Sequence, residues 1–158
     1  KIRTGFGYDV HRLVPDRPLW LGGIRIEHSL GLLGHSDADV LIHAICDAVL
    51  GASGLRDIGF YFPDNSEEFK DIDSKILLAR TMKLMREAGY EIGNVDATII
   101  AQRPKISPYI PEMQRTLAAV MQIAEEDITV KATTTEHLGF AGREEGIAAC
   151  AVALVTRE

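Results

Sequence analysis

The chain has 158 residues, 46% of them hydrophobic, and a formal net charge of −6 at pH 7. This length is enough for one well-buried domain and short for two, so we expect a single domain over residues 1–158. The acidic balance, the few aromatic residues and the lack of a basic stripe argue against a nucleic-acid partner. An anionic small molecule would have to be held by bound cations and a few local donors.

The sequence carries no apolar run of membrane-spanning length, and its first residues lack the basic and apolar segments of a secretory signal. We therefore expect no membrane partner and a cytoplasmic location. The two cysteines, Cys46 and Cys150, lie far apart, one in a helical pattern and one in a strand pattern. This placement predicts reduced, buried thiols.

Residues 2–13 alternate between apolar positions and positions that are polar or glycine, which predicts a half-buried strand. Asp9 and His11 stand two residues apart, so their side chains leave the same face of that strand. Gly5 and Gly7 share this face. We therefore expect that no side chain obstructs the approach to the Asp9 and His11 pair.

Two short strands are predicted next, over residues 19–21 and 24–26, on either side of a glycine pair. Residues 27–34 have the composition of a loop. The loop is followed by His35 and by Ser36, which we expect to cap a helix. A histidine at a helix N-terminus, beside free backbone N–H groups, is well placed to contact a phosphate.

The helix that follows has apolar residues at helical spacing and carries His43. Asp9, His11 and His43 would form a set of two imidazoles and one carboxylate, which leaves a fourth position open as in catalytic zinc sites. Asp39 and Asp47 lie four residues either side of His43, where either could accept its free ring N–H. The same spacing also arises by chance, and a lone histidine in a helix is more often structural than a ligand.

Residues 57–66 contain too many breakers for regular structure, which predicts a mobile loop that covers a substrate or, equally, a solvated connector. A helix from about Ser74 to Gly89 is expected to be structural. A strand over residues 92–101 then ends in a basic loop at residues 102–105.

A helix is predicted over residues 107–121 and a strand over residues 127–132. The strand ends in Thr133-Thr134-Thr135-Glu136, whose hydroxyls suit phosphate oxygens and whose carboxylate suits a divalent cation. Three threonines are also simply good strand formers, so both interpretations stay open. Residues 139–143 are expected to form a flexible loop. The final strand, over residues 147–155, is so apolar that something must cover both of its sides.

The order of these elements predicts an α/β domain, an α+β sandwich in which helices cover one face of a mixed four-stranded sheet. The other face then needs a partner. Burying it against copies of the same chain would give a closed homo-oligomer.

Seven short motifs, each present once, are distributed along the whole chain: Gly5-Phe6-Gly7-Tyr8-Asp9-Val10-His11, Gly34-His35-Ser36-Asp37, Asp57-Ile58-Gly59, Phe62-Pro63-Asp64, Ala101-Gln102-Arg103-Pro104-Lys105, Thr133-Thr134-Thr135-Glu136 and Gly139-Phe140-Ala141-Gly142-Arg143. In this order and at these separations they resemble the 2-C-methyl-D-erythritol 2,4-cyclodiphosphate synthase family of the non-mevalonate isoprenoid pathway. Two positions depart from the family pattern: Ala38 stands where the family often has glycine, and Ala141 where it often has threonine.

The resemblance implies a chorismate-mutase-like homotrimer with active sites at the subunit interfaces. It implies a phosphorus-oxygen lyase that converts 4-diphosphocytidyl-2-C-methyl-D-erythritol 2-phosphate into the cyclic diphosphate and CMP. The partner would thus be a cytidine diphosphate derivative, and the cofactors zinc and a second divalent cation, magnesium or manganese.

The resemblance also implies roles for individual residues. Asp9, His11 and His43 would bind zinc, Glu136 the magnesium or manganese ion, and His35 and Thr134 would be catalytic. His35 and Ser36 would contact the methylerythritol phosphate end, and Asp57 the methylerythritol hydroxyls. Other substrate-binding residues would be Asp9, Val10, His11, Ile58, Gly59, Phe62, Pro63, Asp64, Asn65 and Ser66. The cytidine diphosphate side would be contacted by Ala101, Gln102, Arg103, Pro104, Lys105, Ile106, Ser107, Thr133, Thr134, Thr135 and Glu136. Phe140 and Arg143 would lie toward the centre of the trimer.

This chemistry needs position and charge rather than a protein nucleophile, because the substrate's own phosphate attacks. Lys105, Lys131 or Thr134 could steady the departing CMP. Two alternatives stay open. A zinc phosphodiesterase would use the same three ligands to activate water, and a non-enzymatic trimeric module would have the architecture without a metal.

Overall fold

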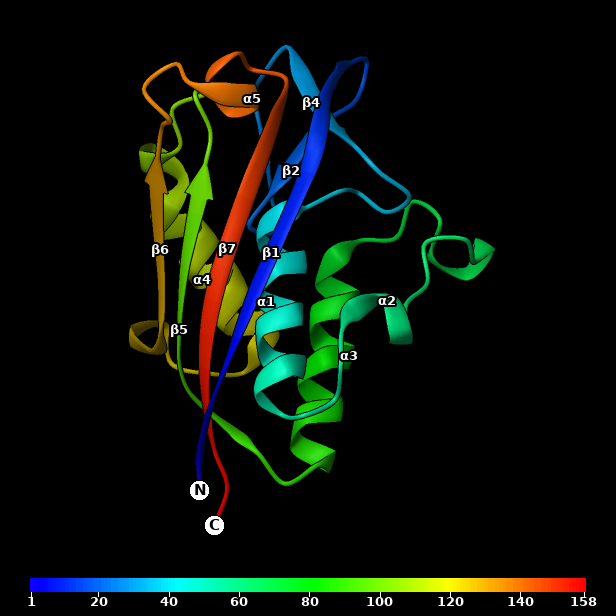
Figure 1. Ribbon diagram of the computed structural model, residues 1–158, viewed down its shortest axis with the longest axis vertical. Helices are drawn as coiled ribbons and strands as arrows, with labels where there is room; N and C mark the ends of the chain where they lie inside the picture. Colours follow the sequence, from blue (N-terminus) through cyan, green and yellow to red (C-terminus); the bar gives the residue numbers. More distant parts are fainter.

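The sheet of the computed structural model, which describes residues 1–158, has five strands in the order β4-β1-β7-β5-β6. These strands are β1 (Ile2–Pro15), β4 (Leu30–Leu33), β5 (Glu91–Ile100), β6 (Ile128–Thr133) and β7 (Gly146–Thr156). The pairs β1 with β4, β1 with β7 and β5 with β7 are antiparallel, whereas β5 and β6 are parallel. The sheet is therefore mixed, as predicted, and Figure 1 shows it nearly face on.

The prediction of four strands is wrong because the segment 27–34, expected to be a loop, contains β4. Residues Leu30–Leu33 pair with Arg12–Pro15 at the far end of the long strand β1 and extend the sheet by one edge strand. The glycines and the histidine give this segment the composition of a loop. Its strand conformation depends on pairing with β1. The predicted short strands β2 (Leu19–Leu21) and β3 (Ile24–Ile26) form a separate two-stranded hairpin.

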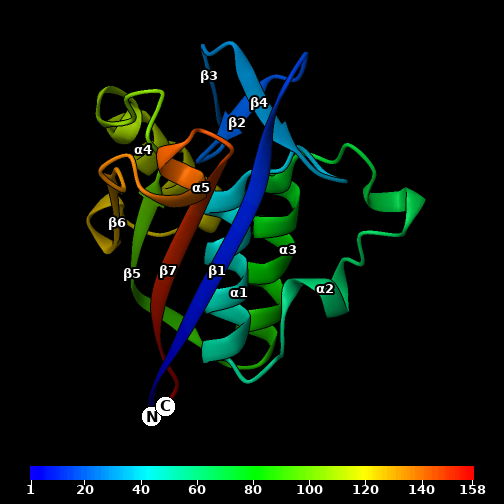
Figure 2. The same ribbon diagram turned by 45° about the horizontal axis from the view of Figure 1, so that its top comes forward.

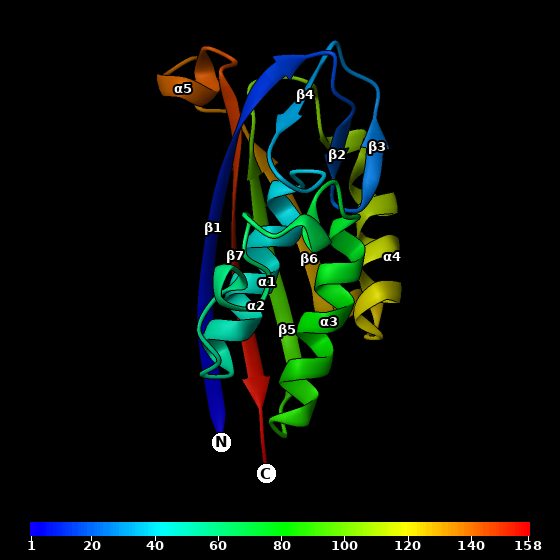
Figure 3. The ribbon, with the colours of Figure 1, turned by 90° about the vertical axis from the view of Figure 1, so that its right-hand side faces the viewer.

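Three main helices, α1 (Val40–Ala52), α3 (Ser74–Glu87) and α4 (Ile110–Met121), cover one side of the sheet (Figure 3). Single turns form α2 (Ile58–Tyr61) and α5 (Gly139–Gly142), and 3-10 turns lie at Glu67–Phe69, Ser107–Tyr109 and Glu125–Asp127. The segments 57–66 and 139–143, predicted to be irregular, thus each contain one helical turn. None of the helices combines the length and the apolar composition that crossing a membrane requires.

The first helix begins three residues later than an N-cap at Ser36 would give, because Asp39 and not Ser36 is its N-cap. The Asp39 carboxylate accepts the backbone N–H of Ile42, and it also accepts those of Gly22 and Gly23 at the tip of the β2–β3 hairpin. The cap therefore fixes the hairpin over the end of α1 (Figure 2). His35 and Ser36 consequently lie in the loop before the helix rather than at its N-terminus.

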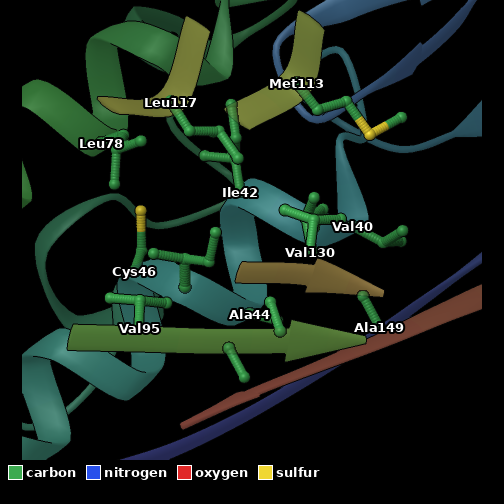
Figure 4. Close-up of a cluster of buried hydrophobic side chains, with 14 of the residues drawn as sticks. Val40, Ile42, Ala44, Cys46, Leu78, Val95, Met113, Leu117, Val130 and Ala149 are labelled. Atoms are coloured by element: carbon green, nitrogen blue, oxygen red, sulfur yellow. The ribbon is translucent and has the colours of Figure 1, made fainter. Parts of the chain in front are cut away.

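Helix α1 is buried on nearly every side because it lies between the sheet and the outer helices α3 and α4. Its apolar side chains meet those of all three neighbours in one core (Figure 4). The labelled members of this cluster are Val40, Ile42, Ala44, Cys46, Leu78, Val95, Met113, Leu117, Val130 and Ala149. The core thus holds α1 firmly against the strand that carries Asp9 and His11.

The opposite face of the sheet has no helix over it and exposes large apolar side chains. Ile2 is 70% exposed and Phe6 64%, and Phe6 pairs across β1 and β7 with Val152, which is 45% exposed. Exposed apolar surface that is contiguous across two strands is unusual for a monomer. The sequence predicted that both sides of the final strand, β7, are covered. Within one chain only the side that faces the helices is covered.

Candidate functional site

Strand β1 and helix α1 bring the three predicted metal ligands together. His11 Nε2 and His43 Nδ1 each lie 3.1 Å from Asp9 Oδ2. The ligand atoms of all three residues lie within 4.8 Å of one another, and each side chain is partly accessible. Ligands at about 2.0 Å from a tetrahedral zinc ion are separated by about 3.3 Å, and the two separations from Asp9 Oδ2 match this value.

Two glycines of β1 make this meeting possible, and their role differs from the predicted one. A Cβ on Gly7 would lie 1.9 Å from the carbonyl oxygen of Ala44, and one on Gly5 would lie 2.1 Å from that of Ala48. The backbone of α1 therefore rests directly on the strand. The glycines do not open an approach to Asp9 and His11, as expected from the sequence, but admit the helix that carries His43.

The second ring nitrogen of His11 also supports a metal site. His11 Nδ1 lies 2.8 Å from the carbonyl oxygen of Leu33. A carbonyl only accepts hydrogen bonds, so Nδ1 carries the proton and Nε2 presents a lone pair toward Asp9 when the ring is neutral. A metal-binding histidine usually has its other N–H engaged in this way. The three residues thus fit a zinc ion in both spacing and tautomer.

Without a metal, the cluster is held by charge. Burial, the largest influence, would raise the pKa of Asp9, but hydrogen bonds from His11 and His43 in their protonated forms, together with the positive charges of those rings, outweigh it and lower that pKa to about 2. Burial, the largest single influence, would lower the pKa of His11, but the hydrogen bond with Asp9, the negative charge of Asp9 and the hydrogen bond with the Leu33 carbonyl together outweigh it and raise that pKa. Asp9 is therefore ionised at neutral pH, as a carboxylate ligand of a metal must be.

Neither of the aspartates predicted to orient His43 does so. Asp39 is fully buried as the cap of α1, and Asp47 accepts the backbone N–H of Ile58 at 2.7 Å. The His43 Nε2 atom instead lies 2.9 Å from Ser74 Oγ and 3.2 Å from Ser36 Oγ. The contact between Ser74 and His43 was not predicted from the sequence, because serine is common at the start of a helix and Ser74 lies at such a position.

An open cavity of about 450 Å³ lies beside the cluster and is lined by many of the residues predicted to bind the substrate, His35 and Ser36 of the methylerythritol phosphate end among them. The predicted residues among its lining are His11, His35, Ser36, His43, Ile58, Gly59, Phe62, Pro63, Asp64 and Asn65. Asp57 is exposed at the start of α2, where its carboxylate accepts the Phe60 N–H. Val10 points to the uncovered sheet face, away from the cavity, because it alternates with Asp9 and His11 along the strand.

Hydrogen bonds of His35 connect two segments of the cavity wall with the loop before α1. His35 Nε2 lies 2.6 Å from the Ser66 carbonyl oxygen, and the His35 carbonyl accepts the Asp71 N–H at 2.7 Å. Because the Ser66 oxygen can only accept, the His35 Nε2 carries a proton, and Nδ1 is the ring nitrogen left for another partner. The segment 57–66 is thus fastened to the loop before α1 through Ser66.

The residues predicted for the cytidine side form a second, separate pocket at the β5–β6 edge. Its lining consists of Ala101, Gln102, Arg103, Pro104, Lys105, Ile106, Ser107, Ala132, Thr133 and Thr134. It shares no residue with the metal-side cavity, and strand β7 separates β1 from β5 and β6 in the sheet (Figure 1). One chain therefore presents two half-sites and does not join them.

Other predicted residues of this side lie outside the pocket lining. Thr135 Oγ1 donates to the Leu138 carbonyl at 2.6 Å, and Glu136 is exposed and belongs to no cluster of three metal-binding side chains. Lys131 is engaged with Asp96 at 2.7 Å on the sheet. Phe140 is 39% exposed, and the exposed Arg143 bonds to Glu145.

The comparisons with known proteins agree with this arrangement. The model of the YgbB family matches residues 2–156. A curated protein of Parabacteroides distasonis named 2-C-methyl-D-erythritol 2,4-cyclodiphosphate synthase is 71% identical over 157 residues, which are 99% of this chain and 98% of that protein.

Solved structures give the same result. The chain matches the IspF CDP complex of Plasmodium falciparum with a TM-score of 0.87 and 38% identity, over 99% of this chain and 97% of that one. It matches the bifunctional IspDF of Campylobacter jejuni with a TM-score of 0.96 and 44% identity, over all of this chain and 43% of that one. From the family model, the relatives and the fold, we conclude that this chain belongs to the YgbB family.

Proposed function

We propose that this chain is a 2-C-methyl-D-erythritol 2,4-cyclodiphosphate synthase, with residues 1–158 as one synthase domain. It would convert 4-diphosphocytidyl-2-C-methyl-D-erythritol 2-phosphate into the 2,4-cyclic diphosphate and CMP. The observation that carries this proposal is the convergence of Asp9, His11 and His43 beside a cavity, in a chain 71% identical to a protein of that name. The CDP in the Plasmodium falciparum complex supports a cytidine nucleotide as the ligand.

In the proposed reaction an oxygen of the substrate's 2-phosphate attacks the β-phosphorus, and the bond from that phosphorus to the bridging oxygen breaks. CMP leaves with the bridging oxygen, so no water is consumed. The protein must hold the attacking oxygen, the phosphorus and the leaving oxygen in line. His35 and Ser36 line the cavity beside the metal ligands, where they would hold the 2-phosphate.

Asp9, His11 and His43 would hold zinc, which would act when bound as a Lewis acid toward the diphosphate oxygens. Glu136 would contribute one carboxylate oxygen to magnesium or manganese. A lone carboxylate suits such an ion, because magnesium in phosphoryl-transfer sites is commonly bound by one or two carboxylates and by substrate phosphates. The exposed Lys105 and Thr134 would contact the CMP half and stabilise its charge as it departs.

A cyclic homotrimer would join the two half-sites of neighbouring subunits. Two observations support it: the uncovered apolar face around Phe6 and Val152, and the separation of the two pockets at opposite parts of the sheet. In a heterologous interface of this kind, the metal side of one subunit meets the cytidine side of the next.

The test is a reaction with the diphosphocytidyl substrate in oxygen-18 water, followed by mass spectrometry. We expect CMP and a cyclic product that both lack the label, since the substrate's own phosphate attacks. A zinc phosphodiesterase would leave one labelled oxygen in a product. Label in either product, or no turnover with zinc and magnesium or manganese present, would contradict the proposal.

A further inference from the structure

A chain of hydrogen bonds leads from the metal site into the interior. His43 Nε2 lies 2.9 Å from Ser74 Oγ, and the Ser74 hydroxyl donates to Asp37 Oδ1. Asp37 also accepts the backbone N–H of Ser74 at 2.9 Å and that of Asp39 at 3.1 Å. Ser74 is fully buried as the first residue of α3. The chain therefore links α1, α3 and the loop before α1.

The positions of the protons in this chain follow from what each group can donate. A carboxylate only accepts, and a serine hydroxyl has a single proton. The Ser74 proton is committed to Asp37, whose negative charge makes that bond the stronger one. Ser74 Oγ can then only accept from His43, and this favours the tautomer of the neutral His43 ring that carries its proton on Nε2. Its Nδ1 presents a lone pair toward Asp9.

We propose that Ser74 and Asp37 are positioning residues that fix the tautomer and orientation of His43 for metal binding. His11 reaches the same state through the Leu33 carbonyl, so both imidazoles turn a lone pair toward Asp9. Three lone pairs at such short separations repel one another unless a cation lies between them. This relay of hydrogen bonds, from His43 through Ser74 to Asp37, thus favours a metal ion in the cluster.

Two other groups compete for the proton of the His43 ring: Asp9, 3.1 Å from Nδ1, and on the Nε2 side Ser36. Its hydroxyl oxygen lies farther away, at 3.2 Å, and already accepts the backbone N–H of Ala38 at 3.1 Å. With the His43 proton directed to Ser74, the hydroxyl proton of Ser36 stays free for a ligand in the cavity. The relay therefore separates the residue that orients the metal ligand from the residue that faces the substrate.

The inference rests on the metal site of the proposed function, so zinc affinity of the unaltered protein is measured first, by competition with a chelator. Ser74→Ala and Asp37→Asn are then compared with Ser53→Ala. Ser53 is a matched control because it is also a buried serine of a helix end, bonded only to the Val49 carbonyl and away from the site. Thermal melting shows that each variant is folded.

We expect Ser74→Ala and Asp37→Asn to weaken zinc binding by about 10- to 100-fold, as is typical when the partner of a metal-binding histidine is lost. Ser53→Ala should bind zinc as the unaltered protein does. Zinc binding by folded Ser74→Ala within threefold of the unaltered protein would overturn the proposal. So would a loss that occurs in Ser36→Ala but not in Ser74→Ala.

Nitrogen-15 NMR of the histidine rings gives a second readout that does not depend on zinc. In the zinc-free protein at pH 8.5, the His43 signals should show the Nε2–H tautomer, and Ser74→Ala should show a mixture of tautomers. An Nδ1–H tautomer in the unaltered protein would overturn the relay. If the unaltered protein bound no zinc, the proposed metal site would fail, while the NMR result would still decide the assignment of the proton.

Discussion

Gly7 of β1 lies against Ala44 of α1 so closely that a Cβ on the glycine would come within 1.9 Å of the Ala44 carbonyl oxygen. The next residue toward the N-terminus on that helix is His43, and two residues along the strand is Asp9. The separation between strand and helix therefore sets the distance between the metal ligands. Packing of backbone on backbone determines the geometry of the candidate site.

Gly7→Ala should consequently destabilise the fold and weaken the metal site together. The added methyl group has no space, because the atom it would meet is backbone, so we expect a loss of about 1–3 kcal/mol or more in the free energy of unfolding. Zinc affinity should fall as well, since His43 must move away from Asp9. Denaturant unfolding and chelator competition measure the two effects.

Gly51→Ala is the matched control for that variant. Gly51 is an exposed glycine of α1, and a Cβ there would meet nothing within 4 Å. Alanine is the better helix former by about 1 kcal/mol, so Gly51→Ala should stabilise the protein slightly and leave zinc binding unchanged. Equal stability and zinc affinity in Gly7→Ala and Gly51→Ala would show that the close approach does not matter.

His43→Ala should abolish stoichiometric zinc and activity without unfolding the chain. It removes one of three ligands, so the loss of affinity should exceed the roughly 10- to 100-fold typical of residues that only orient a ligand. The fold should persist because α1 is held by the core on its other sides. Metal analysis and circular dichroism test this, with the partly buried His28 changed to alanine as the control. Full zinc content in His43→Ala would refute the ligand assignment.

Mixed trimers test whether neighbouring subunits share the site. One inactive variant combines His11→Ala with His43→Ala, and the other combines Lys105→Glu with Thr134→Ala. After unfolding and refolding in equal amounts, random assembly makes roughly three-quarters of the rings mixed, and each mixed ring has one interface with two intact halves. About a quarter of all sites should regain activity. Mixed rings that mass spectrometry detects but that show no added activity would place the whole site within one subunit.

Cys46 should resist alkylation in the folded protein up to strongly alkaline pH. Complete burial raises the pKa of its thiol to about 12, from 9.0 in the unfolded chain, so at pH 8 almost no reactive thiolate exists and no path leads to it. The same shift means that this thiol's contribution to stability is complete below pH 9. That contribution declines as the pH rises from 9 toward 12, where the unfolded chain has released the proton and the folded one retains it.

Labelling with iodoacetamide and mass spectrometry measures this in a Cys150→Ser variant, so that only Cys46 can react. The adduct should be absent at pH 8 in buffer and complete in denaturant. Rapid modification of the folded protein at pH 8 would mean that α1 opens far more readily than its packing indicates.

The sequence by itself determined the elements whose signal is local. Alternation fixed β1 and the shared face of Asp9 and His11, helical spacing fixed α1 and α3, and the motifs identified the family that the comparisons then showed. The α/β class with helices on one side of a mixed sheet also followed, because the order of strands and helices restricts the layers available.

Only the tertiary structure decided what depends on partners distant in the chain. Strand β4 exists through its pairing with β1, and Asp39 caps α1 while it binds the β2–β3 hairpin, so neither is visible in a local pattern. Ser74 lies 31 residues from His43 in sequence, yet its hydroxyl oxygen lies 2.9 Å from His43 Nε2, where it can accept the N–H of the tautomer that leaves Nδ1 free for a metal. Hydrogen bonds and close packing between distant segments carry no periodicity, because they are set by where the core places the elements.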